Sequence, residues 1–247
     1  MGLIYFKLKS FPHTSETFIV SNFIFAKKKG FDIRIITDKY FGLKNSSQRV
    51  MLKEICIEDD IIKPFKFKRN IIVKFLQVLK IITNYRILFK IFKYYKLSKS
   101  KNLTPLANLE TYKDVKNNLV HIHFNNAIKN MSGLSSIGFI NPKCIITFHG
   151  NDAFIDNKDS FQKKYGEFYK NHVVAVTVNS KYLKKQVINL GVDALKIHKI
   201  EAGIDSNFFK GTPKTIQKGQ QIDLLSIGRL VQLKGHVFAI RAVYKLK

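Results

Sequence analysis

Residues 18–37 read FIVSNFIFAKKKGFDIRIIT, and this stretch decides the fold. Phe18, Ile19, Phe23 and Ala26 follow helical spacing, and Gly30 stands where such a helix is expected to end. The branched apolar residues of 31–37 then predict a buried strand. Residues 3–9 also have the pattern of a strand, so the chain opens with a strand, a helix of about sixteen residues and a second strand. Such units build parallel sheets with right-handed crossovers.

The same alternation returns further along the chain. Strands are predicted at residues 119–124, 143–148, 173–178 and 196–200, and a helix at 127–137. A second helix follows residue 178, with Asn179 or Ser180 as its cap and Gly191 at its end. About six strands alternate with helices between residues 3 and 200, which predicts an α/β fold with a Rossmann-like, doubly wound parallel sheet.

The predicted domain organisation has three parts. Residues 1–200 form the Rossmann-like domain, and residues 201–221, rich in Gly, Lys and Gln, form a linker. Residues 222–227 predict a new strand, 228–235 a loop, and 236–247 the start of an amphipathic helix. One strand and one helix cannot bury a core. We therefore expect 222–247 to be the truncated first βα unit of a second Rossmann-like domain.

Composition and charge disfavour sequence-specific nucleic-acid recognition and a zinc site. The 247 residues are 45% hydrophobic, enough for a packed core, and 43 Lys and Arg against 17 Asp and Glu leave a net charge of +26. The basic residues are 37 Lys and only 6 Arg, which disfavours sequence-specific nucleic-acid recognition. Cys56 and Cys144 lie too far apart in sequence for a zinc motif, so we expect no metal site and a reduced cytoplasmic location.

The segment 61–109 concentrates the positive charge. It holds twelve Lys or Arg and no Asp or Glu, and on a single helical wheel Arg86, Lys90 and Lys93 share one face, whereas Lys74 and Lys80 do not. One interpretation is an interfacial helix that binds an anionic membrane surface, which would place the protein at the inner face of the plasma membrane. The other is a solvated helix in a lysine-rich protein.

Two loops carry candidate ligand-binding residues. His149, Gly150 and Asp152 follow a predicted strand, at the sheet edge where ligands bind in open α/β folds. His149 can donate to a hydroxyl or phosphate, Gly150 allows close backbone approach, and Asp152 can accept from sugar hydroxyls or cap the next segment. A purely structural turn would also explain this loop.

The second loop, residues 228–235, places Arg229 and Lys234 before a predicted helix N-terminus. That combination suits a diphosphate, although the loop has neither the Walker spacing nor a G-x-G-x-x-G pattern. An ordinary surface loop is the alternative.

Six stretches, taken in their order along the chain, resemble the motifs of one enzyme family. They are residues 10–19 (SFPHTSETFI), 121–124 (HIHF), 147–152 (TFHGND), 178–180 (VNS), 201–209 (EAGIDSNFF) and 226–235 (SIGRLVQLKG). Together they resemble family 4 of the retaining glycosyltransferases, which have the GT-B fold. Glu201 and Ala202 depart from the family's pattern, which has Asn-Gly-type residues there.

The resemblance implies transfer of a sugar from a nucleotide-diphosphate donor to a glycan or lipid-linked acceptor, with retention and without a cofactor, in surface polysaccharide assembly. By analogy, His149 contacts the transferred sugar, while Arg229 and Lys234, with Gly228, stabilise the departing diphosphate. Substrate contacts are also expected from Ser15, Glu16, His123, Gly150 and Asp152.

The family's second domain carries a pair of glutamates for the donor, and these are missing from the 247 residues. We therefore expect a fragment with little or no transfer activity of its own. The alternative function is a noncatalytic module that binds a glycan or an anionic membrane surface. Nonspecific nucleic-acid binding, suggested by the net charge of +26, is a weaker alternative.

Overall fold

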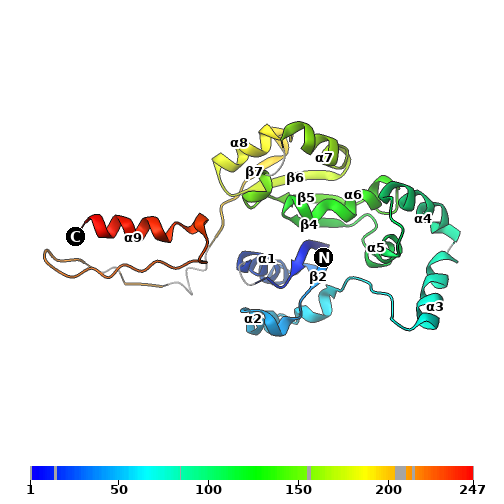
Figure 1. The fold of residues 1–247 in the computed structure, drawn as a ribbon, viewed down its shortest axis with the longest axis horizontal. Helices are drawn as coiled ribbons and strands as arrows, with labels where there is room; N and C mark the ends of the chain where they lie inside the picture. The colour runs from blue at the N-terminus through cyan, green and yellow to red at the C-terminus, as the bar shows by residue number, and fades with distance from the viewer. Residues whose placement is uncertain are drawn as a thin grey trace. The chain divides into compact units, whose positions relative to one another are not determined.

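The computed structural model describes residues 2–13, 16–83, 85–154, 157–203, 210–212 and 215–246. The chain divides into two compact units, Met1–Ala202 and Gly203–Lys247. The first unit contains a sheet with helices on both faces (Figure 1). The second unit contains helix α9 (His236–Lys245) and no described strand.

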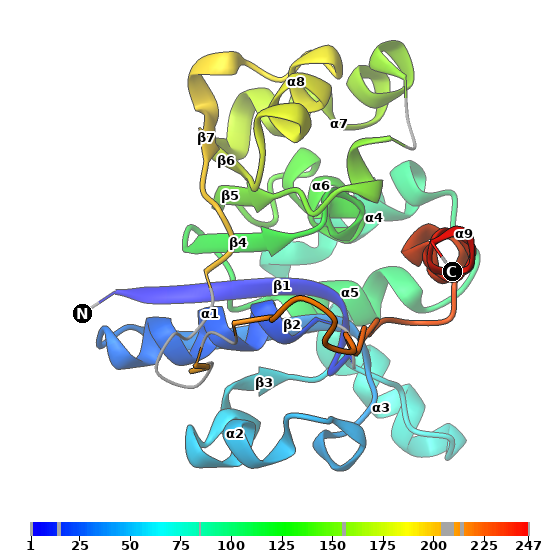
Figure 2. The ribbon, with the colours of Figure 1, turned by 90° about the vertical axis from the view of Figure 1, so that its left-hand side faces the viewer.

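Seven parallel strands form the sheet in the order β3-β2-β1-β4-β5-β6-β7, which Figure 2 shows from bottom to top. The strands are β1 (Leu3–Phe11), β2 (Asp32–Tyr40), β3 (Ile61–Ile62), β4 (Leu119–His123), β5 (Lys143–Thr147), β6 (Val173–Val178) and β7 (Ile197–Lys199). The α/β, Rossmann-like sheet predicted from the sequence is thereby confirmed.

Eight further helices belong to the described part of the first unit. They are α1 (Thr17–Lys28), α2 (Arg49–Glu54), α3 (Ile71–Ile82), α4 (Tyr85–Ser98), α5 (Thr104–Tyr112), α6 (Lys129–Ser136), α7 (Lys158–His172) and α8 (Lys181–Asn189). Helix α8 starts as predicted, because the Ser180 hydroxyl accepts a hydrogen bond from the Leu183 N–H at 3.1 Å. It is followed by Gly191, whose φ of 84° suits a helix C-terminus.

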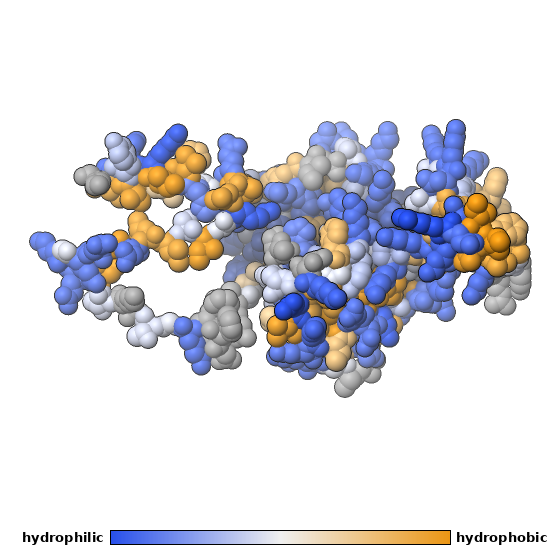
Figure 3. All heavy atoms as spheres, turned by 60° about the horizontal axis from the view of Figure 1, so that its bottom comes forward, coloured by the Kyte–Doolittle hydropathy of each residue, from blue (hydrophilic) through white to orange (hydrophobic). Residues whose placement is uncertain are grey.

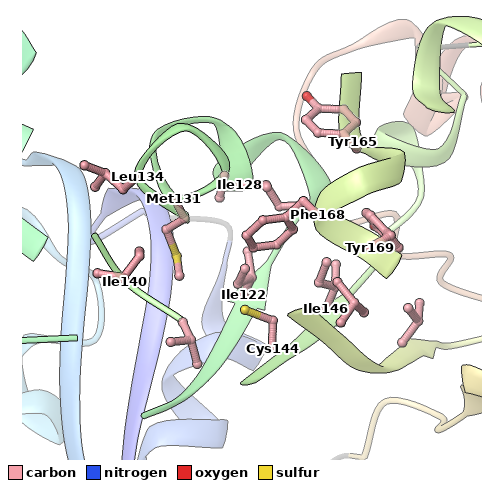
Figure 4. Packing of buried hydrophobic residues seen from close by; sticks show 14 of the residues in the cluster. Ile122, Ile128, Met131, Leu134, Ile140, Cys144, Ile146, Tyr165, Phe168 and Tyr169 are labelled. Carbon is pink, nitrogen blue, oxygen red and sulfur yellow. The ribbon is translucent and has the colours of Figure 1, made fainter. Parts of the chain in front are cut away.

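Two hydrophobic cores cover the two faces of the sheet. Phe6 and Leu8 of β1 pack with α1 and α2, while the alternate residue Tyr5 packs with the larger core on the other face. Figure 4 shows part of that larger core, in which Ile122 and Ile146 of the sheet meet Phe168 of α7. The smaller core draws its strand residues from β1, β2 and β3, so α1 and α2 cover only that half of the sheet.

Several predicted elements differ from the structure. Helix α1 has twelve residues rather than about sixteen. The sequence missed β3, whose two residues pair with Ile35 and Ile36 of β2. The helix predicted at 127–137 is a 3₁₀ turn, Asn125–Ile128, followed by α6. The strand predicted at 222–227 is absent from the described residues. A strand needs a neighbour to complete its hydrogen bonds, and the described part of the second unit offers none.

Candidate functional site

The carboxyl ends of β1, β4 and β5 meet at one edge of the sheet. Strands β1 and β4 are neighbours there although they are not consecutive in the chain, and the chain leaves them toward helices on opposite faces. In open α/β sheets, ligands bind at such a switch point. The residues that follow these three strands therefore define the candidate site.

Asp152 holds the loop after β5 in place. Its Oδ1 accepts hydrogen bonds from the backbone N–H groups of His149 and Gly150, each at 3.0 Å, and its Oδ2 accepts from the N–H of Asn125 at 2.9 Å. The side chain is buried, and burial raises the pKa of the carboxyl, while the backbone N–H donors lower it. The carboxylate thus joins the loops after β4 and β5. All three donors precede Asp152, so it does not cap the next segment as expected, and Asn157 caps α7 instead.

Asn125 extends this support into the core. Its Oδ1 accepts a hydrogen bond from the Tyr169 hydroxyl of α7 at 2.8 Å. Tyr169 is itself buried, and burial raises the pKa of its hydroxyl well above the usual value. The site loop is thus anchored to a helix of the larger core. Neither residue was predicted as a site residue from sequence, although Asn125 directly follows the HIHF stretch at 121–124.

His123 and His149 are brought together by this arrangement. Their rings stack with centroids 5.3 Å apart, and His123 Nδ1 lies 3.1 Å from His149 Nε2. The sequence predicted each as a site residue without predicting their contact, because they come from different strands. The two rings form one hydrogen-bonded pair at the carboxyl edge of the sheet.

The surroundings of His123 favour one arrangement of protons in the pair. His123 is fully buried, and its Nε2 has no hydrogen-bond partner among the described residues. A buried N–H without a partner is rarer in proteins than a buried acceptor without one. We therefore assign the His123 proton to Nδ1, from which it is donated to His149 Nε2. His149 then carries its own proton on Nδ1, where it can be donated to a ligand.

Both histidines are neutral near pH 7. Burial lowers the pKa of His149 to about 4, and it lowers the pKa of His123 well below the usual value, with the neighbouring imidazoles adding to the effect. A neutral His149 donates a hydrogen bond without bringing a positive charge to the site.

Aromatic rings surround His149 on the side of α1. The ring centroid of Phe18 lies 4.6 Å from that of His149, and the Phe124 centroid lies 4.4 Å away. Gly150 has a φ of 128°, and a Cβ built there would meet nothing within 4 Å. The space beside the Gly150 backbone is therefore open, and the approach of a ligand there stays a prediction. Phe18 belongs to the site through its contact with His149, which its helical spacing alone did not reveal.

A second row of polar side chains lies beside the pair. His121 Nε2 and Thr147 Oγ1 form a hydrogen bond of 2.7 Å, and Thr147 Oγ1 lies 2.6 Å from Thr177 Oγ1. Phe6 packs against the rings of His121 and His123, which places this row on the α1 side of the sheet. Burial lowers the pKa of His121 to about 4.

The segment after β1 supplies the remaining predicted residues of the first unit. Ser15 lies outside the described residues. Glu16 occupies the N-cap position of α1, where it makes no side-chain capping hydrogen bond. Burial raises the pKa of its carboxyl, an effect that neighbouring His13 partly offsets. Through Phe18, the first turn of α1 lies against His149.

Gly228, Arg229 and Lys234 belong to the second unit. They precede α9, and the Ser226 hydroxyl and His236 Nδ1 close the loop at 2.9 Å. A Cβ at Gly228 would lie 3.1 Å from His236 Nε2, so the backbone passes close to the first turn of α9. Arg229 and Lys234 are exposed, as are most described residues of the second unit, and none of those residues is buried. Their role at a diphosphate stays a prediction.

An ion pair between a buried lysine and a partly exposed aspartate, on the other face of the sheet, was not predicted from sequence. Lys7 of β1 is fully buried, and its Nζ lies 2.7 Å from Asp38 Oδ1 of β2. The same oxygen accepts hydrogen bonds from the Tyr112 hydroxyl at 3.2 Å and from Asn130 Nδ2 at 3.0 Å. A lysine in an apolar strand gave no signal in sequence, because its partners are distant along the chain.

Comparison with known proteins identifies a family that the chain matches. A family model described as Glycosyltransferase Family 4 matches residues 26–208, more than half of the chain. The matched range includes His123, His149, Gly150 and Asp152, and it excludes Glu16 and the loop with Arg229 and Lys234. No curated protein matches the sequence significantly.

The described residues were also searched for membrane-spanning helices and for clusters of metal-binding side chains. None of their helices has the length and apolar character needed to cross a membrane. Among them there is also no group of three or more His, Cys, Asp or Glu side chains placed to hold a metal ion.

Proposed function

This chain belongs to glycosyltransferase family 4, and on that basis we propose that it transfers a sugar from a nucleotide-diphosphate donor to a glycan or lipid-linked acceptor. We propose further that the configuration at the sugar's anomeric carbon is retained. The observation that carries the proposal is the His123–His149 pair, held by Asp152 at the carboxyl edge of β4 and β5.

His149 is the proposed contact to the transferred sugar. Its Nδ1–H donates to a sugar hydroxyl, because its Nε2 is occupied by His123. Phe18 and Phe124 restrict the ring, so little rotational freedom is lost when the ligand binds. Glu16 and Ser15 are proposed to face the acceptor, and Gly150 lets the ligand approach the backbone.

The loop with Gly228, Arg229 and Lys234 is the proposed diphosphate contact. In the transfer, the bond between the anomeric carbon and the phosphate oxygen breaks, and the acceptor oxygen bonds to the same face of that carbon. The acceptor's hydroxyl proton passes to the departing phosphate oxygen, so no side chain is assigned as general base. Negative charge grows on the diphosphate, and two cations stabilise it.

The exposure of the second unit bears on the activity of the 247-residue chain. None of the described residues among 203–246 is buried, so a diphosphate held there alone stays in contact with water. Water weakens the attraction between the phosphates and the two cations. We therefore expect weak transfer, or none, from the purified 247-residue chain.

The proposed biological setting is surface polysaccharide assembly on the cytoplasmic side of the membrane. A lipid-linked acceptor presents its sugar close to a bilayer, which requires the enzyme to work at that surface.

A transfer assay tests the proposal. The protein, as the cell produces it, is incubated with UDP- and GDP-hexoses labelled in the sugar and with lipid-linked and free oligosaccharide acceptors. We expect label in the acceptor, in the anomeric configuration of the donor. Saturable glycan binding without nucleotide binding or label transfer would contradict the proposal and identify a noncatalytic glycan-binding module instead.

A further inference from the structure

Helices α3 and α4 present apolar side chains to the solvent. On α3 these are Ile71, Ile72, Phe75, Leu76 and Leu79, whose spacing places them on one face of the helix. On α4 they are Leu88, Phe89 and Phe92. We call these eight residues the apolar face. Figure 3 shows hydrophobic side chains flanked by hydrophilic ones at its right, where Figure 1 places the two helices.

The apolar face is not needed to hold the helices on the fold. Helix α3 packs through the buried Ile81 and the partly buried Val78 and Ile82, and α4 packs through Tyr94, Ile87 and Ile91. The Asn70 side chain fixes the start of α3 by accepting from the N–H groups of Ile72 and Val73. Both helices are therefore anchored by their inner sides, and their outer sides remain open.

An apolar hollow joins the two helices. It is lined by Ile82, Thr83, Leu88, Ile91, Phe92 and Tyr95. The hollow includes Leu88 and Phe92 of the apolar face and reaches the C-terminal end of α3 at Ile82. Contiguous exposed apolar surface of this kind marks an interaction site in soluble proteins.

The charges around the apolar face indicate which kind of partner binds it. Residues 61–109 carry twelve Lys or Arg and no Asp or Glu. Lys93 lies over the Phe89 ring, 4.7 Å from its centroid, so its charge sits beside the apolar face. A second copy of the chain would bring the same uncompensated charge against this one. An anionic bilayer instead supplies both acyl chains for the apolar side chains and phosphates for the lysines.

We propose that α3 and α4 together form a membrane-binding surface, whose apolar face enters the acyl boundary of an anionic bilayer while the flanking lysines contact lipid phosphates. The segment was expected from sequence to act through the charged face of one helix. The structure instead has two helices, and Lys90 of the expected charged face donates a hydrogen bond to the Gly138 carbonyl at 2.7 Å.

This inference rests on the proposed function only in its biological purpose, which is to bring a lipid-linked acceptor to the enzyme. Binding to vesicles requires neither nucleotide nor acceptor. Its failure would leave transfer to a soluble acceptor untouched, and failure of transfer would leave vesicle binding untouched.

The test is sedimentation of the full chain with two kinds of vesicle: phosphatidylcholine alone, and phosphatidylcholine mixed equally with phosphatidylglycerol. The double variant Phe75→Ser/Phe92→Ser removes two rings that are 61% and 67% exposed. The single variant Phe92→Ser has its matched control in Phe25→Ser on α1, where the ring is 63% exposed. The charge variant Lys93→Glu/Lys96→Glu is compared with Lys163→Glu/Lys170→Glu on α7, where both lysines are also exposed.

We expect the chain to sediment with the anionic vesicles and far less with the neutral ones. The α3–α4 variants should each lower the partition coefficient by about tenfold or more, and the controls by less than about twofold. Circular dichroism identifies a variant that fails to fold, in which case the single variant Phe92→Ser replaces it. Equal sedimentation of variants and controls would overturn the proposal. So would a chain that ignores vesicles but loses self-association in the Phe75→Ser/Phe92→Ser variant.

Discussion

Three backbone N–H groups depend on the single carboxylate of Asp152. Replacing Asp152 with Ala leaves all three without this acceptor in a buried site. We expect Asp152→Ala to lower the free energy of unfolding by about 2–4 kcal/mol, and Asp152→Asn, which retains one acceptor oxygen, to lower it by less. Urea unfolding followed by circular dichroism measures the difference. Equal stability of the two variants would contradict the loop-holding role.

The buried histidines make stability depend on pH. The folded pKa of His121 and His149 is about 4, below the 6.5 of the unfolded chain. Between these values the unfolded state binds more protons, so the free energy of unfolding falls as the pH falls from 6.5 toward 4. From pH 7 to pH 5, each of the two histidines accounts for about 2 kcal/mol of this loss.

The readout is urea unfolding at pH 7 and pH 5 for the chain and for His121→Asn. We expect the variant to lose about 2 kcal/mol less over this range, because its replaced side chain does not titrate. The exposed His198 gives the control variant His198→Asn. Burial raises the pKa of Asp152 and Glu16, so these carboxyls oppose the loss of unfolding free energy at acid pH. They are present in every variant, and the difference between variants therefore isolates His121. An unchanged pH dependence of the unfolding free energy in His121→Asn would contradict a lowered pKa for His121.

At the scale of elements, the Lys7–Asp38 pair joins β1 and β2 to α5 and α6 through Tyr112 and Asn130. The two partners are buried unequally, because Lys7 is inaccessible to solvent whereas Asp38 is partly exposed. Burial lowers the pKa of Lys7, and the Asp38 carboxylate opposes that shift. Loss of the carboxylate would leave an uncompensated buried cation.

We therefore expect Asp38→Asn to lower the free energy of unfolding by about 3 kcal/mol and Lys7→Met to lower it by clearly less. In Lys7→Met the carboxylate keeps its two neutral donors and its access to water. Thermal and urea unfolding of both variants at pH 7 measure the order. A larger loss for Lys7→Met would show that the lysine, and not the unpaired charge, dominates the energetics.

Local sequence patterns predicted those helices and strands whose own apolar residues are buried. They did not predict features that depend on contacts between residues distant in the sequence. The bounds of Val173–Val178 were predicted to the residue from its continuous apolar run. The expectation that such a run is covered on both faces was wrong here, because Val174 is 50% exposed. Strand β3 was missed because two residues give no period. His123 and His149 were each predicted from their positions after strands, but their contact depends on strand order, as does the role of Asn125.

At the scale of the whole molecule, the core and the sheet lie in Met1–Ala202, and no described residue of Gly203–Lys247 is buried. We expect a chain of residues 1–202 to fold alone and to have a Tm within about 2 °C of that of residues 1–247. Differential scanning calorimetry of the two chains tests this. A much lower Tm for the shorter chain would show that the second unit stabilises the first.

The central claim is that sugar transfer takes place at the carboxyl edge of β1, β4 and β5. The most direct measurement is kcat/KM for sugar transfer by the protein as the cell produces it, compared between His149→Ala and His172→Ala. His172 ends α7 directly before β6, at the opposite edge of the sheet, and is a matched control. We predict a loss of about a hundredfold or more for His149→Ala and less than about threefold for His172→Ala. Equal kcat/KM for the two variants would contradict the account.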